Sequence, residues 1–187
     1  MDRRASRVHL LGAPDRRAQS HLVPNKRVLI LLLTGAAAGA ALIAFALPAA
    51  SDRLLYNHTP SVPVGFYIRT NAPVTRGTYV TVRAADVAPE AARARDFEGR
   101  RDRFIKRIAA VAGDRVCAEG DVLTINDGPP MSRRTHDSTG AELRRWNGCR
   151  ALAAHEVLLL GDAEQSFDGR YWGPIDRNLI EGVWGPL

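Results

Sequence analysis

The most informative residue for chemistry is a lysine in a chain that otherwise uses arginine. The sequence has 24 arginines and two lysines, and Lys106 is the only lysine beyond residue 27. Arginine is not deprotonated in proteins, whereas a lysine with a depressed pKa can act as a base. In a strand, Phe104, Lys106, Ile108 and Ala110 share one face, which is apolar apart from the lysine. Burial there would lower the pKa of Lys106. The alternative is a structural lysine whose amino group reaches solvent.

A neutral lysine amine can activate a serine hydroxyl, and Ser61 is the best-placed candidate. It lies between Pro60 and Pro63 in the segment 57–67. Proline removes N–H donors and favours an extended conformation in the residue before it. The segment is therefore predicted to be a stiff, exposed turn that enters a strand at Phe66. Taken alone, a serine between prolines is most often an ordinary loop residue.

A third cluster of polar residues follows a predicted buried strand, in the segment 161–174. If this segment is extended, Ser166, Asp168 and Arg170 lie on one face. The alternative is a surface turn with an exposed Asp–Arg pair, which would contribute under about 1 kcal/mol to stability.

The elements that would position these three clusters are short strands. Alternation of apolar residues and turn signals predict strands at 66–69, 78–82, 104–111 and 156–160, and a hairpin over 116–125. A short helix or flexible insert is expected at 89–97, and a polar excursion at 129–148. Many short strands with close turns predict a mainly β fold, a barrel-like antiparallel domain.

An apolar segment precedes this domain. Residues 28–50 form an uncharged run of 23 residues, which as a helix is about 35 Å long and can cross a bilayer. Residues 1–27 carry seven cations and two anions, which favours a cytoplasmic N-terminus. We therefore expect a basic cytoplasmic leader at 1–27, a transmembrane anchor at 28–50 and an extracytoplasmic domain at 51–187. The alternative is a signal peptide cleaved near the small residues Ala44 and Ala46.

The charge distribution excludes one class of protein. The net charge is +6, but the 160 residues after the leader carry 19 cations and 18 anions. Because the basicity lies in the leader, a basic nucleic-acid-binding domain is not expected.

Two cysteines, Cys117 and Cys149, lie beyond the predicted anchor. An even number of cysteines in an oxidising compartment predicts one disulfide. The bond would stabilise the fold by about 3–4 kcal/mol. Two buried free thiols and a metal-binding pair are the alternatives, although no C-x-x-C spacing occurs and no histidine is near. No cofactor or metal site is predicted.

In this order and behind one anchor, the three clusters resemble the type I signal peptidase superfamily of Ser/Lys peptidases. Ser61-x-Pro63 resembles its nucleophile box, Lys106-Arg107-Ile108 with Gly113-Asp114 its lysine box, and Gly161-Asp162…Ser166-x-Asp168-x-Arg170-x-Trp172-Gly173 its C-terminal box. The form Ser61-x-Pro63-x-Gly65-x-Tyr67 and the segment 146–150 are most similar to TraF-type conjugative-transfer peptidases. The chain lacks the Ser-Met-x-Pro-Thr of general signal peptidases, and Ala163 replaces an asparagine that often follows Gly-Asp.

The resemblance implies a role for each residue. Ser61 would be the nucleophile and Lys106 the general base, and the Ser61 N–H and the Thr59 hydroxyl would hold the oxyanion. Ser166 would orient the lysine, and Asp168 would pair mainly with Arg170. A carboxylate directly on Lys106 would raise its pKa and oppose its role as a base, although the TraF branch implicates this aspartate in activity.

The resemblance also implies a reaction and a location. The protein would be a single-pass protein of the bacterial inner membrane that cleaves a membrane-associated precursor after small residues in the periplasm. In the TraF branch the precursor is the conjugative pilin, and its own N-terminal amine or water resolves the acyl-enzyme. The expected partners are the lipid bilayer, the precursor and mating-pore components. A general signal peptidase and a non-catalytic membrane-tethered module are the alternatives.

The charge asymmetry yields a topology prediction. An alkaline phosphatase fused after Leu187 should be active in cells, because the leader cations hold the N-terminus in the cytoplasm. Phosphatase activity and membrane fractionation measure this. An inactive fusion that remains bound to the membrane would reverse the orientation.

Overall fold

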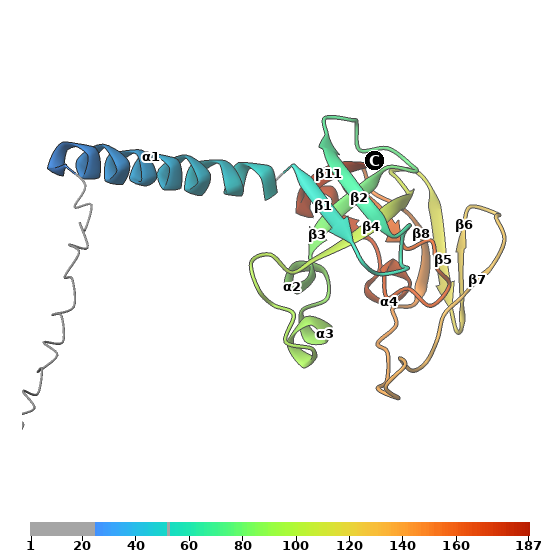
Figure 1. Cartoon of the computed structure of the whole chain (residues 1–187). Coiled ribbons are helices and arrows are strands. Elements are labelled where there is room, and N and C mark those ends of the chain that lie inside the picture. Colours follow the sequence, from blue (N-terminus) through green and yellow to red (C-terminus); the bar gives the residue numbers. More distant parts are fainter. Residues whose placement is uncertain (1–24, 52) are drawn as a thin grey trace, which may run out of the picture. The chain divides into compact units, whose positions relative to one another are not determined.

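The computed structural model describes residues 25–51 and 53–187 and separates the chain into two units, residues 1–45 and 46–187. Most of the basic leader lies outside the described residues. Helix α1 (Lys26–Ser51) is rich in Ala and Leu, which favour helix. Its segment Lys26–Ala44 is long and apolar enough to cross a membrane, by length and composition. The predicted apolar N-terminal helix is therefore confirmed, while its boundaries as an anchor stay a prediction (Figure 1).

The second unit is built on a seven-stranded sheet with the strand order β1-β2-β11-β3-β4-β9-β10 (Figure 1). Its strands are β1 (Leu54–Asn57), β2 (Gly65–Thr70), β3 (Tyr79–Arg83), β4 (Arg103–Ala110), β9 (Glu156–Leu160), β10 (Ile175–Asp176) and β11 (Ile180–Pro186). Each neighbouring pair in this order is antiparallel. The hairpin β1–β2 is joined to the β3–β4 pair through β11.

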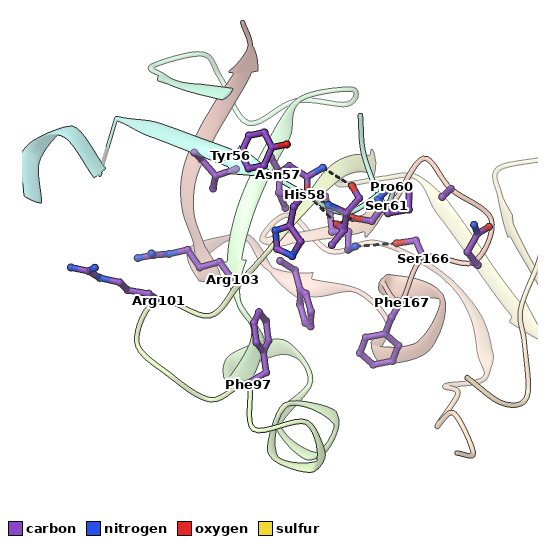
Figure 2. Close-up of a pocket in the computed structure, with 17 residues that line it drawn as sticks. Tyr56, Asn57, His58, Pro60, Ser61, Phe97, Arg101, Arg103, Ser166 and Phe167 are labelled. Atoms are coloured by element: carbon purple, nitrogen blue, oxygen red, sulfur yellow. Dashed lines mark hydrogen bonds between the residues drawn. The ribbon is translucent and has the colours of Figure 1, made fainter. Parts of the chain in front are cut away.

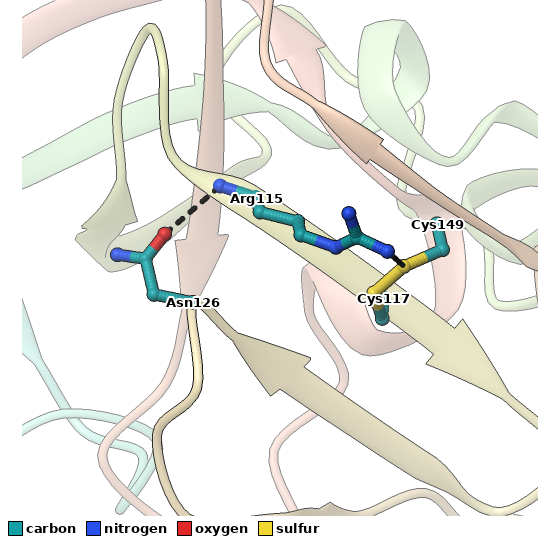
Figure 3. Close-up of a disulfide and its surroundings, with 4 residues drawn as sticks. All are labelled: Arg115, Cys117, Asn126 and Cys149. Carbon is teal, nitrogen blue, oxygen red and sulfur yellow. Dashed lines mark hydrogen bonds between the residues drawn. A yellow bond between two sulfur atoms is a disulfide. The ribbon is translucent and has the colours of Figure 1, made fainter.

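A smaller antiparallel sheet has the order β7-β6-β5-β8. Its strands are β5 (Arg115–Glu119), β6 (Val122–Ile125), β7 (Met131–Ser132) and β8 (Gly148–Ala151). Cys117 on β5 lies directly opposite Cys149 on β8, and the two form a disulfide (Figure 3). The predicted disulfide is confirmed, and the alternatives of free thiols or a metal pair are wrong.

Between residues 53 and 187 the helical structure is confined to short pieces. They are α2 (Ala84–Val87), α3 (Pro89–Ala94), α4 (Gly169–Trp172) and the 3₁₀ turn Arg177–Leu179. Pro89 occupies the first turn of α3, where its missing N–H has no intrahelical partner to lose. The helix predicted at 89–97 is therefore confirmed but ends earlier.

The two faces of β4 and β9 organise the core. Val80, Val82, Ile108 and Leu159 pack in one apolar cluster, while Ala110, Val116, Leu123 and Leu158 pack in another. A third cluster joins the turn that carries Ser61 to the sheet and contains Val62, Tyr67, Tyr79, Ile105 and Trp184. The antiparallel, mainly β class is confirmed, and its strands divide into two sheets. Every segment in which the sequence analysis predicts a strand or hairpin does contain strands: 66–69, 78–82, 104–111, 116–125 and 156–160.

Candidate active site

A cavity of about 660 Å³ collects residues from three distant segments. Ser61 and Thr59 line it from the β1–β2 turn, Lys106 from β4, and Ser166 and Phe167 from the loop after β9. Figure 2 shows the labelled Ser61 and Ser166 facing the same space, with Phe97 and Phe167 on another wall. The fold thus brings together the three clusters that the sequence placed 45 and 60 residues apart.

Ser61 lies in a turn that is held at several points. Val62 is fully buried, and the hydroxyl of Tyr67 donates to the Pro63 carbonyl at 2.7 Å. The Ser61 carbonyl accepts the Asp162 N–H at 2.6 Å, which ties the turn to the end of β9. The Ser61 hydroxyl remains half-exposed and lies 3.0 Å from the Thr59 hydroxyl. The predicted stiff turn therefore exposes its serine to the cavity.

Lys106 is buried as the alternation of β4 predicts. Lys106 and Ile108 are buried on one face, and Lys106 is only 3% exposed. A register shift between Ile108 and Ala110 interrupts the alternation, and Ala110 packs in the other apolar cluster. Its Nζ donates to Ser166 Oγ at 3.0 Å and lies 5.7 Å from the centroid of the Phe104 ring. The alternative of a lysine that reaches bulk solvent is wrong.

Burial lowers the pKa of Lys106 from 10.5 to about 8. Desolvation of the ammonium group is the main cause, and the positive charge of Arg170 adds to it. The negative charges of Asp168 and Asp162 oppose the shift. Because desolvation prevails, a large part of the population carries a neutral amine slightly above neutral pH.

Ser166, Asp168 and Arg170 are not arranged as an extended strand. Asp168 instead precedes the helical turn α4, and its side chain accepts the Arg170 N–H at 3.0 Å. A carboxylate that caps a helix start favours the helix over an extended chain. Ser166 and Arg170 are buried at 4% exposed each and Asp168 at 0%. Both the extended conformation and the alternative of an exposed surface pair are therefore wrong.

Asp168 and Arg170 build the loop that carries Ser166. Asp168 Oδ2 accepts the Gly161 N–H at 2.7 Å and pairs with Arg170 Nη2 at 3.1 Å. Arg170 also donates to the carbonyls of Gly161 and Ala163, at 3.1 and 3.0 Å, and to that of Glu164. Burial raises the pKa of Asp168, against the influence of Arg170 and the two N–H donors.

Gly161 and Asp162 each have a structural role in the site that the sequence analysis does not predict. A Cβ on Gly161 would lie 2.1 Å from Ser166 Oγ and 2.7 Å from the Ser61 carbonyl oxygen, so only glycine fits between them. Asp162 accepts two hydrogen bonds from Arg107, at 2.7 and 2.6 Å, which lower the pKa of the carboxylate. The signal available in the sequence was a Gly-Asp pair directly after a buried strand.

These features define a class of protein before any comparison. A membrane-span candidate precedes a mainly antiparallel domain whose cavity is lined by a half-buried serine and by a buried lysine of depressed pKa. Residues 26–185 match the family model for signal peptidase, peptidase S26. The chain belongs to this peptidase family.

Named relatives narrow the comparison. Two proteins from Escherichia coli, each called plasmid transfer protein TraF, are 34% and 33% identical over 142 residues, covering 70% of this chain and 80% of each relative. A crystal structure of a signal peptidase I from Enterococcus faecalis V583 is 19% identical, with a TM-score of 0.36 over 61% of this chain and 98% of that one. The chain is a TraF-like member of the S26 family.

The buried amine predicts a pH-dependent stability penalty. Below about pH 8 the folded protein holds a charged Lys106 that costs about 3 kcal/mol relative to water. Between pH 8 and 10.5 the unfolded chain binds more protons than the folded one, so this penalty decreases as pH rises. Lys106→Met should therefore be more stable than wild type at pH 7, and the difference should narrow toward pH 10.5. Denaturant unfolding at both pH values measures it, and an unchanged difference would contradict the prediction.

Proposed function

We propose that Ser61 and Lys106 form the Ser/Lys dyad of a membrane-anchored serine endopeptidase. One observation carries the proposal: a buried lysine with a pKa of about 8 lines the same cavity as a serine on a constrained turn. The hydrogen-bond partner of Nζ is the neutral Ser166 hydroxyl rather than a carboxylate. The amine therefore retains a lone pair for a proton near physiological pH.

The chemistry follows from these two groups. Lys106 Nζ accepts the Ser61 hydroxyl proton as Oγ attacks the scissile carbonyl carbon. The ammonium then returns this proton to the nitrogen of the leaving amine as the C–N bond breaks. An ester on Ser61 remains, and a water molecule or a second amine releases it with Lys106 again as base.

The oxyanion needs donors at the nucleophile turn. Ser61, unlike Pro60 and Pro63, has a backbone N–H, which would serve as one donor. The Thr59 hydroxyl, 3.0 Å from Ser61 Oγ, is the second. Donors at this position would stabilise the charge that develops on the carbonyl oxygen.

The supporting residues act through Lys106 and its loop. Ser166 orients the amine by its 3.0 Å hydrogen bond. Asp168 and Arg170 shape the loop that presents Ser166. The charge of Asp168 raises the pKa of Lys106 and that of Arg170 lowers it, so pairing the two limits the effect of the carboxylate. We assign Asp168 an architectural role in activity on this basis.

The substrate is a membrane-associated precursor cleaved after small residues. Two relatives named plasmid transfer protein TraF support a role in conjugation, and the pilin precursor is our proposed substrate, with cyclisation by its own amine as the final step. The proposed location is the bacterial inner membrane, with the catalytic domain in the periplasm beside mating-pore components.

The dyad is tested by Lys106→Arg, which keeps a cation and a long stem. Guanidinium does not accept the Ser61 proton near neutral pH, and general-base catalysis contributes about 10²–10⁴-fold. We expect precursor cleavage by folded protein to fall at least about 100-fold. Wild-type activity should increase with pH through about pH 8, because only the neutral amine is competent.

The matched control is Arg144→Lys, an exchange of the same two side chains on an exposed arginine. It should leave cleavage unchanged. Circular dichroism and membrane fractionation verify folding and insertion of both variants. Near-normal turnover by folded Lys106→Arg would mean that Ser61 has another base.

The choice of substrate is tested separately. Purified full-length protein should cleave a conjugative pilin precursor at least about tenfold faster than a secretory preprotein, a difference that enzyme pockets readily reach. Intact mass spectrometry distinguishes a cyclic product, lighter by one water, from a linear one. Equal cleavage of both precursors would identify a general signal peptidase, and Ser61→Ala serves as the inactive control.

A further inference from the structure

The side chain of Asn57 contacts much of the nucleophile turn. It lies at the end of β1 and is only 4% exposed. Its Nδ2 donates to the carbonyls of Thr59, Val62 and Pro63 at 2.7, 3.0 and 3.1 Å. The amide nitrogen of Asn57 can donate to carbonyl oxygens, whereas the amide oxygen cannot. The three carbonyls therefore determine which way the Asn57 amide is oriented.

The prolines explain why the turn needs this side chain. Pro60 and Pro63 remove two N–H donors from a segment of seven residues, so its carbonyls have fewer main-chain partners. Buried carbonyl groups without a donor are costly. Asn57 supplies two N–H donors from outside the turn. It thereby replaces the N–H donors that the two prolines remove from the turn.

The other end of the amide contacts Thr59. Asn57 Oδ1 lies 3.2 Å from the Thr59 nitrogen and 3.0 Å from Thr59 Oγ1, and it accepts from both. Thr59 has a single hydroxyl proton. When that proton is directed to Asn57, the Thr59 oxygen presents a lone pair to Ser61 Oγ at 3.0 Å. Asn57 therefore determines the direction of the Thr59 hydroxyl in the resting site.

We infer that Asn57 is a positioning residue for catalysis, which holds the Ser61 turn in shape and keeps the Thr59 hydroxyl beside the developing oxyanion. This inference rests on the proposed function. As negative charge forms on the substrate oxygen, the Thr59 hydroxyl rotates from Asn57 Oδ1 to that oxygen. Asn57 Oδ1 keeps the Thr59 N–H, so the exchange leaves no acceptor without a donor. The proton stays on Thr59 throughout.

Two substitutions test the two ends of the amide. Asn57→Ala removes both, and Asn57→Asp keeps the acceptor while replacing the donors with a charge that faces three carbonyls. Loss of one oxyanion donor costs about 10²–10³-fold in kcat. We expect kcat per active site to fall at least about 100-fold in both variants. In Asn57→Ala the midpoint of the pH profile should stay near 8, because this substitution adds no charge near Lys106.

A double-mutant cycle separates positioning from stability. Thr59→Val removes the hydroxyl and Thr59→Ser keeps it. Asn57 holds the turn and also positions Thr59, so Asn57→Ala should cost clearly less in the Thr59→Val background than in wild type, since residues acting as a unit are non-additive. In the Thr59→Ser background, Asn57→Ala should retain its full effect. Independent, multiplying losses would overturn the inference.

Controls distinguish failure of this inference from failure of the proposed function. Asn147→Ala, at an exposed asparagine that does not line the cavity, should leave kcat unchanged. Active sites are counted with an acylating probe, so that unfolded protein is excluded. Normal kcat per labelled site in Asn57→Ala, with Ser61→Ala and Lys106→Arg inactive, would overturn only the role of Asn57. Activity in those last two variants would overturn the proposed dyad itself.

Discussion

The site depends on keeping one amino group out of water without giving it a carboxylate partner. Desolvation in the apolar face of β4 lowers the pKa of Lys106, and a direct carboxylate contact would reverse that effect. The surroundings meet both conditions. Nζ donates to a hydroxyl, while the nearby Asp168 is engaged by the Gly161 N–H and by Arg170. The buried pair of Asp168 and Arg170 thus shapes the loop that carries Ser166, and the two charges have opposite effects on the pKa of Lys106.

Close backbone contacts then join the three chain segments. Gly161 lies between Ser166 and the Ser61 carbonyl with no space for a Cβ, and the Asp162 N–H donates to that same carbonyl. The end of β9 therefore contacts both serines of the site at once. Arg107 fixes Asp162 from the strand that carries the lysine. Movement of any one of the three segments would therefore disturb the other two.

Much of this arrangement could be predicted from the sequence. Alternation along 104–110 indicates the buried face of Lys106, and the prolines around Ser61 indicate a stiff turn. The α4 turn was missed because four residues, Gly169–Trp172, show no helical period. Strand β11 was missed because it contains Gly182, Gly185 and Pro186, which are depleted in strands. The close approach of Gly161 to Ser61 depends on how distant segments pack, and no local pattern encodes it. The contacts of Asn57 lie within six residues of it, but the residue types alone do not show that its amide turns back onto the turn.

The place of β11 in the sheet has a consequence for biogenesis. This strand is the last of the sheet to be synthesised, yet it lies between β2 and β3 and is hydrogen-bonded to both. Until residues 180–186 are inserted, the hairpin that carries Ser61 is not joined through the sheet to the strand that carries Lys106. The topology therefore delays assembly of the site until β11 has been synthesised.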